Sequence, residues 1–323
     1  MSARLLIVGL LAAVVSSGAC GSGSCVQFDG QSILARHDAD RDRLDLLLIY
    51  RDLHTTGDPA EALAQLESIR DGERTFALAA NFPLLFAIDG LTREKRRADR
   101  PADAALLDAL QARTTVRSGP LWRDSQGRVC GSQLVRLDGL GALLAAINAA
   151  LREELSRPDE LERFAAEARL EDDESLARLR AAVAGGFTFA GLRGSAPWFA
   201  LPVSDVGFIA LKRGLFDAWA TDAEPKGPGA GRETRTRALL EALAVNDWTL
   251  ERSPGVVTFV LGTPDATTVE LTVPPIGRAE PGVPDVLARR ALADTLRPRG
   301  WTIGGPDGEA TARAAFEAFT REP

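Results

Sequence analysis

The sequence predicts an α+β fold in which antiparallel β-hairpins carry helices packed on one face, arranged as two such halves. Two patterns lead to this prediction. In several short segments, apolar side chains alternate with polar ones between turn residues, which is typical of strands joined in hairpins. In longer segments, apolar side chains recur at i, i+3, i+4 and i+7, which is typical of helices that bury one stripe.

Two hairpins are expected in the first half of the chain. The first turns over 38–42, between arms at 31–37 and 43–52, and the second turns over 124–127. An amphipathic helix follows the second hairpin, with Asp138 as its N-cap. Its apolar stripe consists of Leu140, Leu143, Leu144, Ile147 and Leu151.

Between these hairpins, the chain is expected to form two helices and a pair of strands. A helix is predicted over 58–72, because Asp58 is a suitable N-cap and Pro59 suits the first helical position. Two short apolar strands follow within 74–90. A second helix is expected over 102–112.

The second half repeats this mixture of strands and helices. Its expected elements, in chain order, are two connecting helices within 158–185, a strand pair within 186–205, a helix begun by Ser204 or Asp205, a helix ending near 245, three strands within 247–273, and closing helices over 285–296 and 309–319. The predicted organisation is a signal peptide at 1–19, a tether at 20–27, an N-terminal domain at 28–157, a helical connection at 158–186 and a C-terminal domain at 187–323.

Charge and composition argue against nucleic-acid binding. The chain has 38 basic and 45 acidic residues, and removal of a leader containing Arg4 would leave a net charge of −8. An acidic protein with charges of both signs interspersed repels a phosphate backbone. We therefore expect no nucleic-acid partner.

The first residues have the features of a secretory leader. Arg4 precedes an uninterrupted apolar run over 5–15, and small residues follow it. A run of this length is too short for a stable membrane-spanning helix, which needs about 20 residues, but it suits the core of a signal peptide. Ordinary signal-peptide cleavage could occur after Ala19.

The residues Ser17-Gly18-Ala19-Cys20 resemble the lipobox of bacterial lipoproteins. Gly18 and Ala19 match its small positions, Cys20 occupies its invariant position, and Ser17 replaces the usual large aliphatic residue. The resemblance implies that the Cys20 thiol is lipidated and that the chain is cut just before it. It covers only the first twenty residues.

The three cysteines are consistent with this lipid anchor. If Cys20 carries the lipid, Cys25 and Cys130 remain as an even pair, and such a pair in an exported protein predicts a disulfide. The competing pairing, Cys20 with Cys25, closes a small loop and leaves Cys130 free.

The acidic segment over 38–42 has a partial likeness to a calcium loop. Asp38, Asp40 and Asp42 occupy the first three acidic positions of an EF-hand loop. Arg43 stands where that loop needs Gly, and Ile49 stands where it needs a bidentate Glu. A polar hairpin turn is the preferred interpretation, and we expect no metal site.

Other candidate residues also have structural interpretations. His37 and His54, the only histidines, are expected in surface loops. Ser195 lacks the surrounding pattern of a nucleophile elbow and is expected in a turn. The glycine-rich segment after Lys226 is expected to be a linker, and the basic segment over 93–100 a solvated loop.

Together these features favour a membrane-tethered lipoprotein of the bacterial cell envelope, facing the periplasm or the outside, with a non-catalytic binding or assembly role. Its expected partners are the membrane, through the lipid, and an envelope protein or a cell-wall component. No cofactor is expected. Two alternatives stay open: an envelope hydrolase with a carboxylate- or histidine-based site, and a soluble periplasmic protein without lipid.

Overall fold

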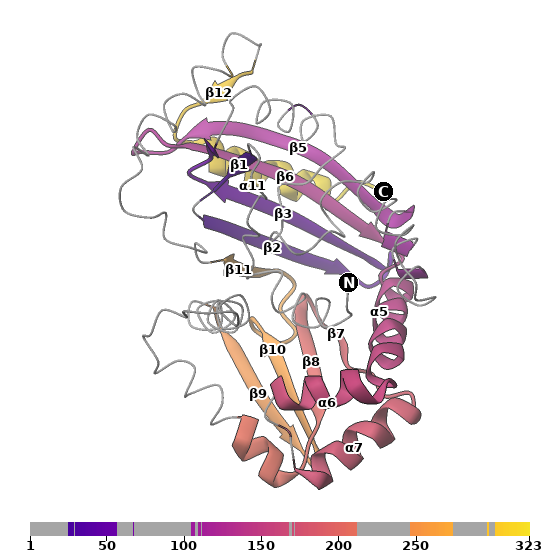
Figure 1. Cartoon of the computed structure of the whole chain (residues 1–323). Coiled ribbons are helices and arrows are strands. Elements are labelled where there is room, and N and C mark those ends of the chain that lie inside the picture. Colours follow the sequence, from indigo (N-terminus) through magenta and orange to yellow (C-terminus); the bar gives the residue numbers. More distant parts are fainter. Residues whose placement is uncertain are drawn as a thin grey trace, which may run out of the picture.

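The structure is a computed structural model that describes residues 25–28, 30–56, 67, 105–106, 109–110, 112–167, 170, 172–211, 246–273, 296 and 301–323. These residues form helices and largely antiparallel sheets, which confirms the predicted α+β class (Figure 1). Two larger sheets, of six and four strands, are accompanied by a small two-stranded sheet.

The six-stranded sheet is the centre of the fold, with the strand order β11-β2-β3-β6-β5-β12. Its strands are β2 (Gly30–Asp38), β3 (Arg43–Arg51), β5 (Thr114–Arg123), β6 (Val129–Asp138), β11 (Val269–Val273) and β12 (Ile303–Gly304). The β2–β3 and β5–β6 hairpins confirm the two hairpins predicted in the first half. All neighbours in this sheet are antiparallel except β5 and β12.

The central sheet buries both of its faces. On one face lies α11 (Gly308–Phe319), whose Phe316 and Phe319 pack on Leu47 and Ile49 of β3. The other face packs against residues of the second sheet, including Val260. Each fully buried aliphatic or aromatic side chain contributes about 1.5–3 kcal/mol to this packing.

The four-stranded sheet has the order β7-β8-β10-β9 and packs against three helices. Its strands are β7 (Ala190–Arg193), β8 (Ala196–Pro202), β9 (Trp248–Ser253) and β10 (Val256–Leu261). The helices are α5 (Leu140–Leu155), α6 (Pro158–Glu167) and α7 (Asp173–Ala184). A further helix begins at residue 205, where the Ser204 hydroxyl accepts a hydrogen bond from the Gly207 N–H at 2.9 Å, as expected of an N-cap.

The small sheet pairs β1 (Cys25–Gln27) with β4 (His54–Thr56) and lies near the end of β3 (Figure 1). The backbone turns sharply between β3 and β4 at Asp52, which has a φ of 56°. The next N–H, from Leu53, donates to the carbonyl oxygen of Val129 at 2.7 Å. Phe28 then packs edge-on against Tyr50, with ring centroids 5.2 Å apart.

The two larger sheets do not follow the predicted division of the chain at residues 157 and 187. The central sheet contains β11 and β12 from the second half of the chain, beside four strands from the first half. Helix α11, also from the second half, packs on one face of this sheet. The sequence predicts the division from the charged helical segment at 158–186, interpreted as a connection between two halves, but strand β11 pairs with β2 across more than 230 residues. A pairing of this kind leaves no local signature.

The N-cap predicted for α5 is also corrected. Gly139, with a φ of 66°, occupies that position in place of Asp138. The first two N–H groups of the helix donate hydrogen bonds to Asp42 of the β2–β3 turn. Its backbone oxygen accepts from Leu140 at 2.8 Å, and its carboxylate accepts from Gly141 at 2.7 Å. A residue far away in the chain therefore caps this helix.

Several predictions lie wholly or mostly outside the described residues. They concern the signal peptide at 1–19, Cys20 and its tether, the helix at 58–72, the strands within 74–90, the basic segment at 93–100, the glycine-rich segment after Lys226, the helix ending near 245 and the helix at 285–296.

Candidate functional site

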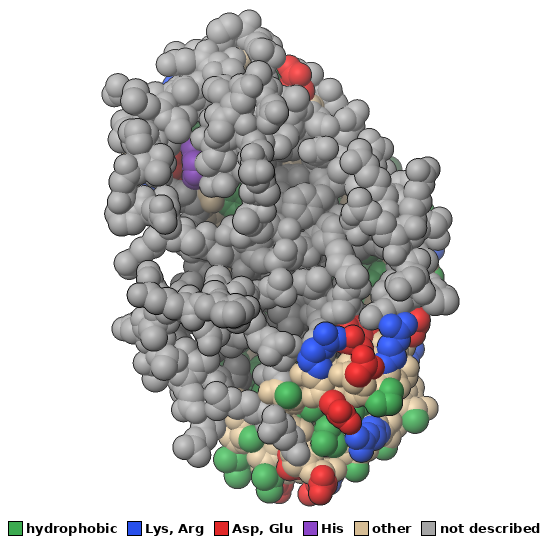
Figure 2. Space-filling model, in the orientation of Figure 1, with side chains coloured by type: hydrophobic (Ala, Val, Ile, Leu, Met, Phe, Trp, Pro, Cys, Tyr) green, Lys and Arg blue, Asp and Glu red, His purple; other side chains and the backbone are tan. Residues whose placement is uncertain are grey.

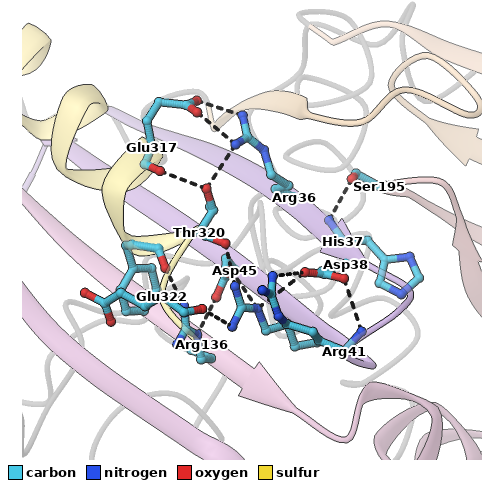
Figure 3. Close-up of polar contacts among 12 residues, drawn as sticks. Arg36, His37, Asp38, Arg41, Asp45, Arg136, Ser195, Glu317, Thr320 and Glu322 are labelled. Carbon is cyan, nitrogen blue, oxygen red and sulfur yellow. Dashed lines mark hydrogen bonds and ion pairs between the residues drawn. The ribbon is translucent and has the colours of Figure 1, made fainter.

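Ser195 and His37, both considered separately in the sequence, meet where the two larger sheets come together. The Ser195 hydroxyl accepts a hydrogen bond from the backbone N–H of His37 at 2.8 Å and donates one to the carbonyl oxygen of Thr267 at 2.7 Å. The imidazole of His37 turns away from that hydroxyl (Figure 3) and donates from Nδ1 to the Gly194 carbonyl at 3.0 Å. The hydroxyl therefore joins the β7–β8 turn to β2 and to the segment before β11, and the ring is not placed to act as its base.

His54 makes a similar local contact. Its side chain is buried, and Nδ1 lies 2.9 Å from the carbonyl oxygen of Asp52. Because a carbonyl oxygen can only accept, Nδ1 carries the proton in this hydrogen bond. The surface position predicted for His54 is wrong, because the side chain is buried. Its hydrogen bond to Asp52 helps to hold the sharp turn between β3 and β4.

The acidic β2–β3 turn is organised by contacts within the protein. Asp38 accepts hydrogen bonds from the backbone N–H and the guanidinium of Arg41, at 3.1 and 2.8 Å. The bond from the Arg41 side chain is the largest cause that lowers the pKa of Asp38. With Asp42 used as the cap of α5, the turn has the polar structural role preferred in the sequence analysis.

Cys130 is a free, buried thiol in the structure. It lies on the face of the central sheet that α11 covers, among Ile49, Trp122 and Phe316. Phe28, just after β1, packs on Tyr50 on the opposite face. The structure therefore gives no support to the predicted disulfide between Cys25 and Cys130, because the sheet separates this thiol from the segment that follows β1.

A cluster of charged side chains, not identified from the sequence, lies beneath the C-terminal end of α11 (Figure 3). We call Arg43, Asp45 and Arg136 the arginine cluster. All three are at most 7% exposed. Asp45 lies directly across from Arg136 in the sheet and binds its Nε at 2.8 Å, and it approaches the Nε of Arg43 at 3.2 Å.

The two guanidinium groups of the arginine cluster hold the backbone at the end of α11. Arg43 donates to the carbonyl oxygens of Thr320 and, at 2.8 Å, Glu322. Arg136 donates to the carbonyl oxygen of Phe319 and stacks on its ring, 4.2 Å from the centroid. The last carbonyls of a helix have no partner within the helix and carry partial negative charge, so buried cations are favoured there.

More exposed ion pairs extend this attachment along α11. Arg36 of β2 binds both carboxylate oxygens of Glu317, at 2.9 and 2.7 Å. Arg51 of β3 binds Glu309 near the other end of the helix, at 2.6 Å. In the described part of the chain, the arginine cluster and these ion pairs contact other groups of the protein. The arrangement therefore holds α11 on the central sheet.

The sequence did carry one signal of the arginine cluster. Arg43 and Asp45 alternate along β3 with Leu44 and Leu46, and the same alternate positions continue as Leu47 and Ile49. A strand that is apolar on both faces is buried on both faces, and a buried charge requires a partner. That reasoning would have predicted an ion pair at this position.

The surface of α6 and α7 carries charges of both signs. Figure 2 shows Arg side chains interspersed with Asp and Glu side chains over these helices. Several form pairs along one helix, as Arg178 does with Glu174 at 2.7 Å. Among the described residues, no three or more His, Cys, Asp or Glu side chains converge in the manner of a metal site.

The chain was compared with family models, with curated proteins and with solved structures, and no match was found in any of the three comparisons. In the ranges that the structure describes, no helix is both long and apolar enough to cross a membrane.

Proposed function

We propose that this protein is a lipid-anchored, non-catalytic component of the bacterial cell envelope, exported by its leader and held at the membrane through Cys20. The observation that carries the proposal is the order of segments in residues 1–20: one basic residue, a short apolar run, small residues and then a cysteine. Acyl chains contribute about 0.8 kcal/mol per buried CH₂, so two or more chains give stable attachment without insertion of the protein.

Two features of the fold support a tethered domain with a binding or assembly role. Strand β1 begins at Cys25, only five residues after Cys20. In addition, the side chains that could have suggested catalysis are engaged in structural hydrogen bonds. Ser195 joins the β7–β8 turn to β2 and to the segment before β11, and the His37 ring binds the backbone of Gly194. The partner of the tethered domain is proposed to be another envelope protein or a cell-wall component.

The test compares Cys20→Ser with Cys25→Ser, a matched change five residues away. The full-length chain is expressed in a bacterium that processes lipoproteins, the cells are fractionated, and the purified protein is measured by intact mass spectrometry. The wild type and Cys25→Ser are expected in the membrane fraction, beginning at residue 20 with the added mass of a lipid. Cys20→Ser is expected to lack that mass.

Two results would contradict the proposal. One is a native protein that still begins with Met1. The other is a processed protein that carries an unmodified Cys20 and is found entirely in the soluble fraction, which would instead support the soluble periplasmic alternative.

A further inference from the structure

The length of the tether restricts where β1 can lie, given the lipid anchor proposed above. Five residue steps separate Cys20 from Cys25, and an extended chain spans at most about 3.6 Å per residue. The first residue of β1 therefore stays within about 18 Å of the lipidated cysteine. A tether this short keeps one end of the domain close to the lipid headgroups.

That end of the central sheet is the one where β3 ends. Strands β1 and β4 lie there (Figure 1), and the bond from Leu53 to Val129 attaches them to the start of β6. The turn over 124–127 joins β5 to β6 at the same end. The β2–β3 turn over 39–42 is at the opposite end. The first and last of the nine residues of β3 are eight steps of about 3.3 Å apart, so about 26 Å separates the two ends.

The charges at the two ends do not separate them. The end with the β2–β3 turn carries Asp38, Asp40, Asp42 and Asp138 beside Arg41, Arg43 and Arg113. The end with the β5–β6 turn carries Asp52, Asp124, Asp307 and Glu309 beside Arg51, Arg123 and Arg128. The length of the tether and the position of β1 therefore carry the orientation.

We propose that the end of the central sheet formed by β1, β4 and the 124–127 turn faces the bilayer, and that the β2–β3 turn is directed away from it. The partner of this surface is the lipid bilayer that holds the anchor. The inference rests on the proposed function, because the tether has this effect only if Cys20 is the anchor.

Energy transfer to labelled lipid measures this orientation. Single cysteines are introduced at two exposed turn positions, Ser125→Cys and Ala39→Cys, in a background that carries Cys25→Ser and Cys130→Ala. Each lipidated protein receives a fluorescent donor on the new cysteine. It is then reconstituted in vesicles of phosphatidylcholine and phosphatidylglycerol that contain an acceptor-labelled lipid.

Transfer is expected to be several-fold more efficient from position 125 than from position 39. The same labelled pair with Cys20→Ser, which lacks the anchor, sets the baseline. Equal transfer from the two positions, or stronger transfer from position 39, would overturn the orientation while leaving the lipid anchor intact. If the wild-type chain carries no lipid, the proposed function fails first, and the orientation fails with it.

Discussion

The hydroxyl of Ser195 receives the backbone N–H of His37 at 2.8 Å, and this bond joins the β7–β8 turn to the central sheet. The same hydroxyl donates to Thr267, so a single side chain satisfies backbone groups from two other segments. A serine next to a histidine would suggest a catalytic pair if only the residue names were considered. The geometry gives the pair a structural role, because the histidine contributes its backbone.

Replacing Ser195 with Ala is therefore expected to destabilise the protein. The change removes both hydrogen bonds and leaves the N–H of His37 and the carbonyl of Thr267 without this partner, which costs about 1–3 kcal/mol. Equilibrium unfolding in urea measures the loss. Ser253→Ala, at an exposed position in β9, is the matched control and is expected to change stability little. Equal effects of the two changes would contradict the assigned role.

Removing the negative charge at the centre of the arginine cluster is expected to be more damaging. Asp45→Asn keeps the size of the side chain but leaves Arg136 buried without its counter-charge, and leaves Arg43 with only the Asp38 carboxylate, 4.0 Å from its Nε. Breaking a buried ion pair in this way costs about 3–5 kcal/mol. Asp138→Asn, at an exposed position, is the control. A loss below about 0.5 kcal/mol in Asp45→Asn would show that the cluster does not hold α11.

Acid is expected to weaken the attachment of α11 through Glu309. The hydrogen bond from Arg51 is the largest cause that lowers the pKa of this carboxyl, and Arg313 acts in the same direction. The pKa of a glutamate in an unfolded chain is about 4.3. Because the folded-state pKa is lower, the stabilisation is complete above about pH 4.3 and is lost as the pH falls through the folded-state value.

Melting temperatures of Glu309→Gln measured from neutral pH down to about pH 3 test this sign. The variant is expected to melt lower than the wild type at neutral pH, and the difference is expected to shrink in acid. Glu162→Gln, on the exposed side of α6, provides the control and is expected to leave the pH profile unchanged. A difference between Glu309→Gln and the wild type that persists at the lowest pH would contradict the ion pair.

The start of α11 lies too close to the central sheet for a side chain larger than hydrogen at Gly308. A Cβ built there would overlap the Cβ and Cγ atoms of Trp122, which is 2% exposed. Gly308→Ala is therefore expected to lower stability by about 1–3 kcal/mol. At Gly305 a Cβ would meet no atom within 4 Å, so Gly305→Ala is the control. Equal unfolding midpoints for the two variants would refute the close packing.

The Cys130 thiol is expected to resist alkylation in the folded protein. Burial raises the pKa of this thiol, and the thiolate is the reactive form. Incubation with iodoacetamide before and after unfolding, followed by peptide mass spectrometry, measures the difference. We expect Cys130 to be modified only after unfolding. A peptide in which Cys130 is joined to Cys25 would restore the disulfide predicted from the sequence.

Local features of the fold were predictable, and contacts between distant segments were not. Both hairpins and the apolar stripe of α5 follow from patterns within about twenty residues, because hairpin pairing and helix burial are set by neighbouring side chains. The cap of α5 by Asp42 and the pairing of β11 with β2 join segments far apart in the chain. Nothing in the sequence near either segment identifies its partner.

The candidate sites divide in the same way. The structural roles of the 38–42 turn and of Ser195 were anticipated from the motifs that these residues lack. The buried position of His54 was missed, because the bend at Asp52 that brings the ring inward depends on tertiary contacts. The arginine cluster was missed although β3 carried a readable signal, namely charged residues on a strand that is apolar on both faces.

Strands β11 and β12 form the edges of the central sheet, and α11 covers one of its faces. These late segments also determine the order in which the molecule can fold. The hairpins are made early in synthesis, yet Arg36 finds its partner Thr320 only after 284 further residues have been added. Such non-local contacts slow folding. A chain that cannot complete its core until α11 has been synthesised remains incompletely folded for longer, and this would suit the export proposed above.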